Sequence, residues 1–399
     1  MNSLPTSADA AAMRPDSADL ADAATLWKSA YVHIPFCLRR CPYCDFAIVD
    51  ESVEGRSSVE RYVDAVLAEI EMESGIGPLD AINFGGGTPT RLAPEQLASI
   101  VESLETRFST RGGAEISLEA NPEDWTESLA AGLVEGGFTR VSIGAQSFDD
   151  HVLSSLGRNH TADTIASTVA SARAVGFRSV SIDLIFGHPG ESDESWQTSV
   201  ERALSLDPDH VSTYSLTVEP GTQLSRQVRS GAPAPDDDVQ ADRYEYFVEK
   251  ADAAGIIRYE VSNHARDGHA CRYNLSTWGN GEYVAFGLGA HDHIGRVRSR
   301  NHRRIDRYLE AVEAGERPRL GSETLGAAAS ERDALMFGLR LACGAVLTDT
   351  ATHFVESREG KRLIDAGVMG LSGGRLVVYK PMLTDAVVRE ASSVSAADC

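Results

Sequence analysis

Short apolar runs alternate with longer amphipathic segments through the first half of the chain. Six runs have the β-branched and aromatic composition of strands, and several end beside a glycine or proline; they cover residues 31–36, 81–85, 115–120, 140–146, 179–186 and 210–218. The segments between them predict helices near 57–76, 94–107, 125–135, 161–175 and 192–206. In the first of these, apolar residues recur at three- and four-residue spacing, as on one helical face: Tyr62, Val63, Val66, Leu67 and Ile70.

Six strand–helix units in sequence predict an α/β fold with a parallel sheet and helical crossovers. Eight units close a full barrel, so six predict a partial, open (β/α)6 barrel, with a doubly wound sheet as the alternative. After about residue 265 the pattern changes. Residues 266–303 are rich in glycine and are expected to form mostly loop, and helices return near 304–314 and 330–342.

The final stretch predicts a smaller α+β region. From Lys361 to Ser392 it suggests a helix, a turn at Gly373 and Gly374, a strand over 375–379 and a second helix. This order is winged-helix-like. The expected domains are therefore a tail over 1–30, a core barrel over 31–265 and a C-terminal region over 266–399.

Charge and the first thirty residues narrow the classes of function. Residues 1–30 are rich in alanine and aspartate, unlike a targeting peptide, so we expect a disordered or loosely helical tail and a cytoplasmic protein. The chain has 37 basic and 59 acidic residues, a net charge of −22. This charge argues against nucleic acid or an anionic membrane as the main partner. No apolar run reaches 18 residues, so no transmembrane helix is expected.

Three of the six cysteines, Cys37, Cys41 and Cys44, lie within eight residues directly after the first predicted strand. Active sites of parallel α/β sheets lie at the carboxyl ends of the strands, so this loop is placed for chemistry. Fe–S clusters usually take four cysteines, so three thiolates would leave one iron of a [4Fe–4S] cluster open. A structural zinc site with a fourth ligand such as His33 is an alternative, as are unliganded thiols.

Glycine and polar residues mark the ends of later strands. Gly85-Gly86-Gly87-Thr88-Pro89 ends the second predicted strand, where glycine allows the backbone to approach a ligand closely, although a tight turn also explains it. Glu119, Gln146 and Asp183 lie at or near the ends of successive strands. Polar groups inside a barrel need partners, which are either a ligand or each other in a polar core layer.

Taken together, these motifs resemble a known family. The cysteine loop followed by Gly-Gly-Gly-Thr-Pro resembles the radical S-adenosylmethionine (SAM) superfamily. Longer sequence motifs resemble those of the oxygen-independent coproporphyrinogen III oxidase family, and the resemblance runs from about Tyr31 into the C-terminal region. These motifs are His33-Ile-Pro-Phe-Cys37, Asn83-Phe-Gly-Gly-Gly-Thr-Pro-Thr90, Glu119-Ala-Asn-Pro122, Ser142-Ile-Gly-Ala-Gln-Ser-Phe148, Leu156-Gly-Arg158 and Leu216-Thr-Val-Glu-Pro-Gly-Thr222.

Position 46 separates two branches of that family. The oxidases carry a fourth cysteine where this chain has Phe46, and they carry a structured N-terminal arm. The form Cys-x3-Cys-x2-Cys-x-Phe is that of the HemW-type heme chaperones. The resemblance therefore implies a [4Fe–4S] cluster on Cys37, Cys41 and Cys44, with SAM and heme as further ligands. It also implies delivery of heme to apo-cytochromes or other respiratory heme proteins. Transfer at the membrane face and formation of a homodimer are further expectations.

The resemblance also implies which side chains lie near SAM. Gly86, Gly87 and Thr88 would contact its methionine end. The other expected positions near the cofactor are Tyr31, Tyr43, Glu119, Gln146, Arg158 and Asp183. No catalytic residue is assigned.

A later segment, from Tyr259 to Trp278, corresponds to the part of the family that faces substrate or heme. The chaperones have His-Asn-x-x-Tyr-Trp where this chain has Tyr273-Asn-Leu-Ser-Thr-Trp278, so the expected histidine is absent. Tyrosine can ligate heme iron as a phenolate. The candidate ligands are Tyr273, Cys271, His264, His269 and His291, and none is preferred.

Two rival functions stay open from the sequence. One is a radical SAM enzyme, an oxygen-independent coproporphyrinogen III oxidase. The other is a zinc-stabilised interaction protein, which fits the cysteines but leaves the glycine motif unexplained.

Overall fold

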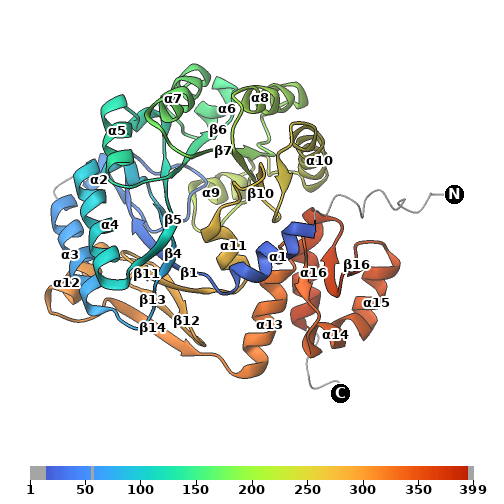
Figure 1. The fold of residues 1–399 in the computed structure, drawn as a ribbon. Helices are drawn as coiled ribbons and strands as arrows, with labels where there is room; N and C mark the ends of the chain where they lie inside the picture. The colour runs from blue at the N-terminus through green and yellow to red at the C-terminus, as the bar shows by residue number, and fades with distance from the viewer. Residues whose placement is uncertain (1–14, 55–57, 394–399) are drawn as a thin grey trace.

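One open sheet forms the centre of the molecule. The computed structural model describes residues 15–54 and 58–393. Six parallel strands lie side by side in chain order (Figure 1): β1 (Lys28–Ile34), β4 (Leu79–Gly86), β5 (Thr110–Ala120), β6 (Arg140–Gln146), β7 (Ser179–Phe186) and β8 (His210–Ser215). The sheet runs on to β14 at one edge and β9 at the other without closing. This arrangement confirms the partial, open barrel.

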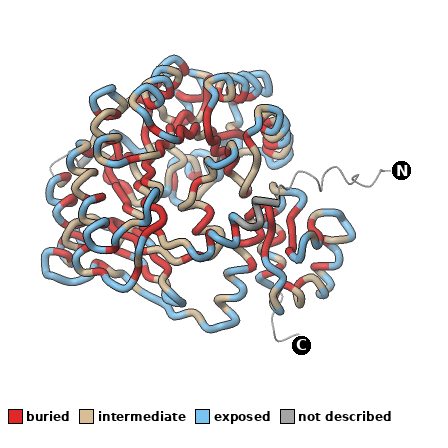
Figure 2. The backbone as a smooth tube through the Cα atoms, in the orientation of Figure 1, coloured by how far each residue is buried: buried red, intermediate tan, exposed pale blue. Residues whose placement is uncertain are grey.

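Helices cover the outer face of these strands. The five predicted helices are confirmed as α3 (Val59–Met72), α4 (Pro94–Phe108), α5 (Glu127–Glu135), α7 (Ala162–Val175) and α8 (Asp193–Ser205). Figure 2 shows buried strands inside and exposed outer turns of the helices. Because the strands are covered on both faces, they are apolar runs rather than alternating ones. In β7 every residue except Asp183 is buried.

Three helices in this part of the chain are absent from the sequence prediction. They are α6 (Asp150–Ser155), α9 (Gln223–Arg229) and α10 (Asp237–Ala253). The buried face of α10 includes Gln240 and Arg243 beside Tyr244 and Phe247. Polar residues on the buried face interrupt the apolar period that sequence analysis relies on.

The expectation of a loop over 266–303 is wrong. This stretch forms α11 (Arg272–Trp278), β11 (Glu282–Phe286), β12 (His291–Ile294) and β13 (Val297–Asn301), and β14 (Arg319–Thr324) completes this side of the sheet. The glycines lie at the turns, where Gly287, Gly289 and Gly295 all have positive φ. The strands are short, and they form because β11 pairs in parallel with β1, a partner distant in sequence. The sheet therefore continues past residue 265.

Like the edge from β11 to β14, the other edge of the sheet, beyond β8, is antiparallel. There β10 (Asn263–Ala265) pairs with β8, and β9 (Ile257–Arg258) pairs with β10. The remaining elements before the C-terminal region are β2 (Phe36–Cys37), β3 (Val49–Asp50), α2 (Glu51–Glu54) and α12 (Ile305–Glu313). No helix in residues 15–54 and 58–393 has the length and apolar character to cross a membrane.

The C-terminal region has a core of its own. Its elements are α13 (Ala327–Gly338), β15 (Ala345–Val346), α14 (Asp349–Glu356), α15 (Arg358–Asp365), β16 (Met369–Ser372), β17 (Arg375–Val378) and α16 (Thr384–Ser393). The strands form a separate sheet in the order β15-β17-β16, packed on a distinct apolar cluster. This order agrees with the α+β, winged-helix-like expectation.

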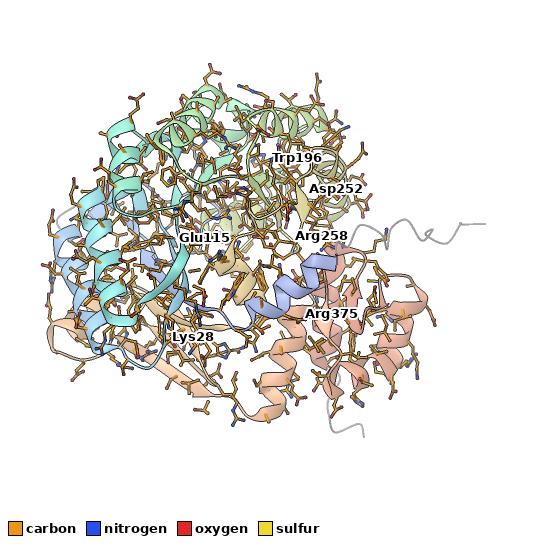
Figure 3. The ribbon with its side chains drawn as sticks, in the orientation of Figure 1. Lys28, Glu115, Trp196, Asp252, Arg258 and Arg375 are labelled. Carbon is orange, nitrogen blue, oxygen red and sulfur yellow. The ribbon has the colours of Figure 1, made fainter. Side chains whose placement is uncertain are left out.

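The N-terminal segment includes one helix, α1 (Pro15–Ala24), while residues 1–14 of the expected tail and Cys399 lie outside the described residues. Ala21 and Ala24 of α1 pack with Leu275 of α11. Asp22 forms an ion pair with Arg375 of β17, which Figure 3 labels. Thus α1 contacts both α11 and the C-terminal sheet, and the domain boundaries at 30 and 265 stay a prediction.

A buried carboxylate on α3 connects the parallel strands to the added ones. Glu69 accepts hydrogen bonds from the backbone N–H of Gly287 at 2.8 Å, the Tyr308 hydroxyl at 2.7 Å and Asn301 Nδ2 at 2.6 Å. Burial raises the pKa of Glu69 to about 7, and the three donors oppose this shift. The side chain therefore joins α3 to α12 and to the chain around β11 and β13.

We expect replacement of Glu69 by alanine to destabilise the protein by about 3 kcal/mol, because three buried donors would lose their acceptor. Denaturant unfolding monitored by circular dichroism measures this change. Glu71→Ala is the matched control, since Glu71 is exposed on the same helix; its effect should stay within about 0.5 kcal/mol. Equal losses in the two variants would show that Glu69 does not connect these elements.

Candidate functional site

The cysteine loop begins at the carboxyl end of β1. The chain leaves β1 at Ile34, and β2 then pairs in parallel with β3, which closes the base of the loop. Arg40 holds the loop from within: its guanidinium donates to the carbonyl oxygens of Cys44 at 3.3 Å, Phe46 at 3.0 Å and Ile48 at 3.3 Å. The loop conformation is therefore fixed by its own hydrogen bonds.

Each of the three thiols of the loop has its own hydrogen-bond partner. Cys37 Sγ lies 3.6 Å from Thr88 Oγ1, and Cys41 Sγ accepts from Arg158 Nη1 at 3.6 Å. The backbone N–H of Phe46 is hydrogen-bonded to Cys44. Burial raises the pKa of Cys37 to about 12 and raises that of Cys44 as well. Donors directed at these sulfurs oppose that effect and stabilise the thiolates, the form that ligates metals.

The hydrogen-bond donors around the three sulfurs indicate which kind of metal group the loop suits. In the described part of the chain, no three His, Cys, Asp or Glu side chains are arranged to hold a metal ion. An iron–sulfur cluster makes a different demand, because cysteine thiolates bind several irons and accept hydrogen bonds at sulfur. Three cysteines with three separate donors meet that demand.

His33, considered as a fourth zinc ligand, has no nitrogen available. Burial lowers the pKa of His33 to about 4, so the ring is neutral and carries one N–H. That N–H is on Nε2, which donates to the Ala47 carbonyl at 2.8 Å, and Nδ1 then accepts from the Tyr31 hydroxyl at 3.1 Å. Zinc binding would break one of these hydrogen bonds. The arrangement fits a cluster better than zinc.

The glycine motif at the end of β4 faces neighbouring protein atoms. Gly86 has φ +105°, and a Cβ there would collide with the His33 ring. A Cβ on Gly87 would lie 2.7 Å from the Pro35 backbone. At Gly85 it would lie 2.6 Å from the Glu119 carboxylate, which accepts a hydrogen bond from the Gly86 N–H at 3.2 Å. The physical reason for these glycines is thus close packing of β4 against β1 and Glu119, not only space for a ligand.

Two half-buried carboxyl groups, those of Glu119 and Asp183, lie inside the barrel. Burial, and then the charge of Asp183, raises the pKa of Glu119 to about 7. Asp183 accepts from Ser142 Oγ at 2.7 Å and Ser181 Oγ at 3.5 Å; burial raises its pKa although the serines oppose this shift. Asp183 therefore has partners in a polar core layer, as one of the two sequence interpretations expects. Glu119 has one backbone donor and retains acceptor capacity for a ligand.

Gln146 and Arg158 meet in the same interior. Gln146 has φ +65°, an uncommon conformation for a residue other than glycine. A Cβ on Gly144 would lie 2.7 Å from Gln146 Nε2 and 3.4 Å from Arg158 Nη2. Arg158 also donates to the Gly144 carbonyl at 3.3 Å, and its buried Nε has no partner among the described residues. That Nε–H is available to an acceptor on a ligand.

Asn121 is a site residue that the sequence analysis did not single out. Its amide links Thr88 to Arg158, because Nδ2 donates to Thr88 Oγ1 at 2.8 Å and Oδ1 accepts from Arg158 Nη2. The signal was its position two residues after Glu119, since alternate residues of a strand point to one face.

The aromatic residues expected near SAM have different surroundings. Tyr43 packs against an apolar cluster that includes Leu156 and Ile185. Tyr31 is stacked on Tyr273, with ring centroids 5.9 Å apart and an interplanar angle of 21°. The assignment of all these side chains to SAM stays a prediction.

The candidate heme ligands do not form one group. Tyr273 lies on α11, whose first N–H, that of Arg272, donates to Glu115 at 2.9 Å; Figure 3 labels Glu115 near the centre. His264 is fully buried on β10, with its ring edge-on to Phe247 at 4.9 Å. The other candidates are the buried Cys271, the half-buried His269 and the exposed His291 on β12. Of the five, Tyr273 stacks on Tyr31, a predicted SAM residue.

Comparison with known proteins supplies a family. Residues 31–203 match the model of the radical SAM superfamily. A Mycobacterium tuberculosis protein described as "Heme chaperone HemW" is 40% identical over 90% of this chain and 93% of its own length. The chain belongs to the HemW family. A Bacillus subtilis HemW is 34% identical over 84% of this chain and 88% of its own length.

A solved structure shares the HemW-family fold seen here. It is the Escherichia coli coproporphyrinogen III oxidase (HemN), described as a radical SAM enzyme, with a TM-score of 0.79. The match covers 95% of this chain and 93% of that chain at 21% identity. At this identity the match shows the fold alone, and it agrees with the expected fold class.

We expect Gly86→Ala to destabilise the protein by about 2 kcal/mol or more without any SAM present, because the added Cβ collides with His33 at a strained φ. Thermal unfolding without and with SAM measures the change. Gly112→Ala is the control, since a Cβ at Gly112 has open space. Unaltered stability of Gly86→Ala without SAM, with weaker SAM binding, would instead support the purely ligand-based explanation.

Proposed function

We propose that this protein is a heme chaperone that binds heme and carries a [4Fe–4S] cluster with SAM. The observation that carries the proposal is the set of three free thiols at the carboxyl end of β1, each with its own donor, in a chain of the HemW family. The radical SAM superfamily implies the cluster and SAM. The name of the M. tuberculosis relative supports heme as the cargo.

Cys37, Cys41 and Cys44 would hold the cluster. A cluster bound by three thiolates supplies an iron with an open position for the amino and carboxylate groups of SAM. Arg158 has a buried N–H without a partner among the described residues, and Glu119 has acceptor capacity. These two side chains therefore suit the carboxylate and an N–H or O–H group of SAM. The other contacts in the proposal are Tyr31, Tyr43, Gly86, Gly87, Thr88, Gln146 and Asp183.

The cargo would be heme, delivered to respiratory apo-cytochromes at the membrane face. The cytoplasm is the proposed compartment, because three thiols that must stay reduced for cluster assembly persist there. Tyr273 is a heme-ligand candidate that contacts one of the proposed cofactor residues, through its stacking on Tyr31. A homodimer is compatible with this proposal.

The rival function is oxidation of coproporphyrinogen III. The match to the E. coli oxidase supports it only at the level of the fold. The position of the oxidases' fourth cysteine is taken by Phe46, whose side chain is exposed. The chaperone is therefore the better-supported function.

We expect the anaerobically purified protein to be brown and to contain about four irons per chain, since a [4Fe–4S] cluster contains four. Alanine at Cys37, Cys41 or Cys44 should abolish the iron, because each thiol is one of three ligands. Iron and sulfide analysis with absorption spectroscopy measures this. Cys271→Ala and Cys343→Ala are the controls, since both thiols are buried and lie outside the loop: Cys271 precedes α11, and Cys343 packs in the cluster of α1 and α11. Zinc in place of iron would refute the cluster.

We expect the reconstituted protein, with SAM and reductant, to bind one heme and transfer it to an apo-cytochrome without converting coproporphyrinogen III. The heme absorption band and porphyrin chromatography on one sample measure both activities. A coproporphyrinogen oxidase tested in parallel serves as the positive control. Oxidation at about 1 s⁻¹, within the ordinary enzymatic range, would overturn the chaperone proposal. Absence of both activities would point to a radical SAM enzyme with another substrate.

A further inference from the structure

A hydrogen-bonded bridge joins two of the three cysteines through side chains that follow β4, β5 and α6. Arg158 donates to Cys41 Sγ at 3.6 Å and to Asn121 Oδ1. Asn121 Nδ2 donates to Thr88 Oγ1 at 2.8 Å, and Thr88 Oγ1 lies 3.6 Å from Cys37 Sγ. The order is therefore Cys41, Arg158, Asn121, Thr88, Cys37.

The chemistry of the groups fixes the direction of each hydrogen bond. A guanidinium only donates, so the amide atom of Asn121 that faces Arg158 must be the oxygen. The amide nitrogen must then face Thr88, and it too only donates. The Thr88 oxygen accepts this hydrogen bond and keeps its single O–H, which donates to Cys37 because a cluster-ligating thiolate can only accept. Arg158 thus orients donors toward both sulfurs, one directly and one through Asn121.

Hydrogen bonds to the cysteine sulfurs are one of the factors that set the potential of an iron–sulfur cluster. Reduction adds negative charge, which the sulfurs share, so donors stabilise the reduced form more than the oxidised form. Burial strengthens the effect because water does not compete for the sulfur. Thr88 is 2% exposed, and the Arg158 side chain is 7% exposed.

We propose that Asn121 is a positioning residue that, between Arg158 and Thr88, aims a donor at Cys37 and so raises the reduction potential of the cluster. This inference rests on the proposed function, since Cys37 and Cys41 must ligate the cluster. Asn121 itself touches neither sulfur. It acts by donating to the Thr88 oxygen, so that the Thr88 O–H cannot point at Asn121 and is directed at Cys37.

Thr88→Val tests the proposal because it removes the hydroxyl and keeps the shape. The midpoint potential of the anaerobically reconstituted full-length protein is measured by redox titration with electron paramagnetic resonance, and iron and sulfide are counted on the same samples. We expect unchanged iron content and a lower midpoint potential. Thr88→Ser keeps the hydroxyl and should retain the parental potential.

Thr90→Val is the matched control. Thr90 lies two residues further in the same turn, is also buried, and its hydroxyl has no hydrogen-bond partner in the described chain. Thr90→Val makes the same chemical change without the loss of a hydrogen bond. The midpoint potential of the cluster in this variant should therefore equal that of the parent. Equal potentials for Thr88→Val and the parent, or equal shifts in Thr88→Val and Thr90→Val, would overturn the proposal.

Asn121→Leu provides a second test if Thr88→Val fails to retain iron. Leucine adds no charge near the cluster and removes the amide that donates to Thr88, so the Thr88 hydroxyl is no longer directed at Cys37. We expect a lower potential with normal iron content, and an unchanged potential would overturn the inference. A parent protein without iron would instead overturn the proposed function, so the two failures are distinguishable.

Discussion

The pairing of β1 on both sides positions most of the candidate site. β1 is hydrogen-bonded to β4 along one edge and to β11 along the other, and both partners run parallel to it. Its carboxyl end is therefore held in the middle of the sheet, and the cysteine loop starts from a rigid point. The same register places His33 opposite Gly85. The glycines at the end of β4 allow this close approach, since any side chain there would collide with β1 or with Glu119.

Desolvation is the second constraint on this site. The interior contains Glu119, Asp183 and Arg158, and the loop places Cys37 at its edge. Burial raises the pKa of both carboxyl groups and of the Cys37 thiol, so each charged form needs a nearby partner. Asp183 accepts hydrogen bonds from two serines, and Cys37 Sγ lies 3.6 Å from the Thr88 hydroxyl oxygen. The buried Nε–H of Arg158 has no partner among the described residues, although Nη2 of the same guanidinium lies 3.9 Å from Glu123, and a hydrogen-bond acceptor on a ligand would satisfy it.

Away from the loop, the carboxylates of Glu69 and Glu115 stabilise the fold because hydrogen-bond donors compensate for their lost contact with water. Glu69 accepts three hydrogen bonds that join α3 to the chain around β11 and to α12. Glu115 accepts from the first N–H of α11 and from Arg140 at 2.9 Å. Each carboxylate connects segments distant in sequence, and each is satisfied by donors from them. The elements added after residue 265 are thus held to the parallel strands by polar contacts as well as by strand pairing.

The amino-acid sequence by itself determined the six parallel strands, their five crossover helices and the position of the cysteine loop. Those features follow from local apolar periodicity and from motifs within a few residues of each other. The tertiary structure decided the rest. The strands β11 to β13 form through pairing with β1 and with each other, which no local pattern records. Likewise, only packing shows that Gly86 faces His33 and that Asn121 links Thr88 to Arg158, because these contacts join residues 33 to 53 positions apart.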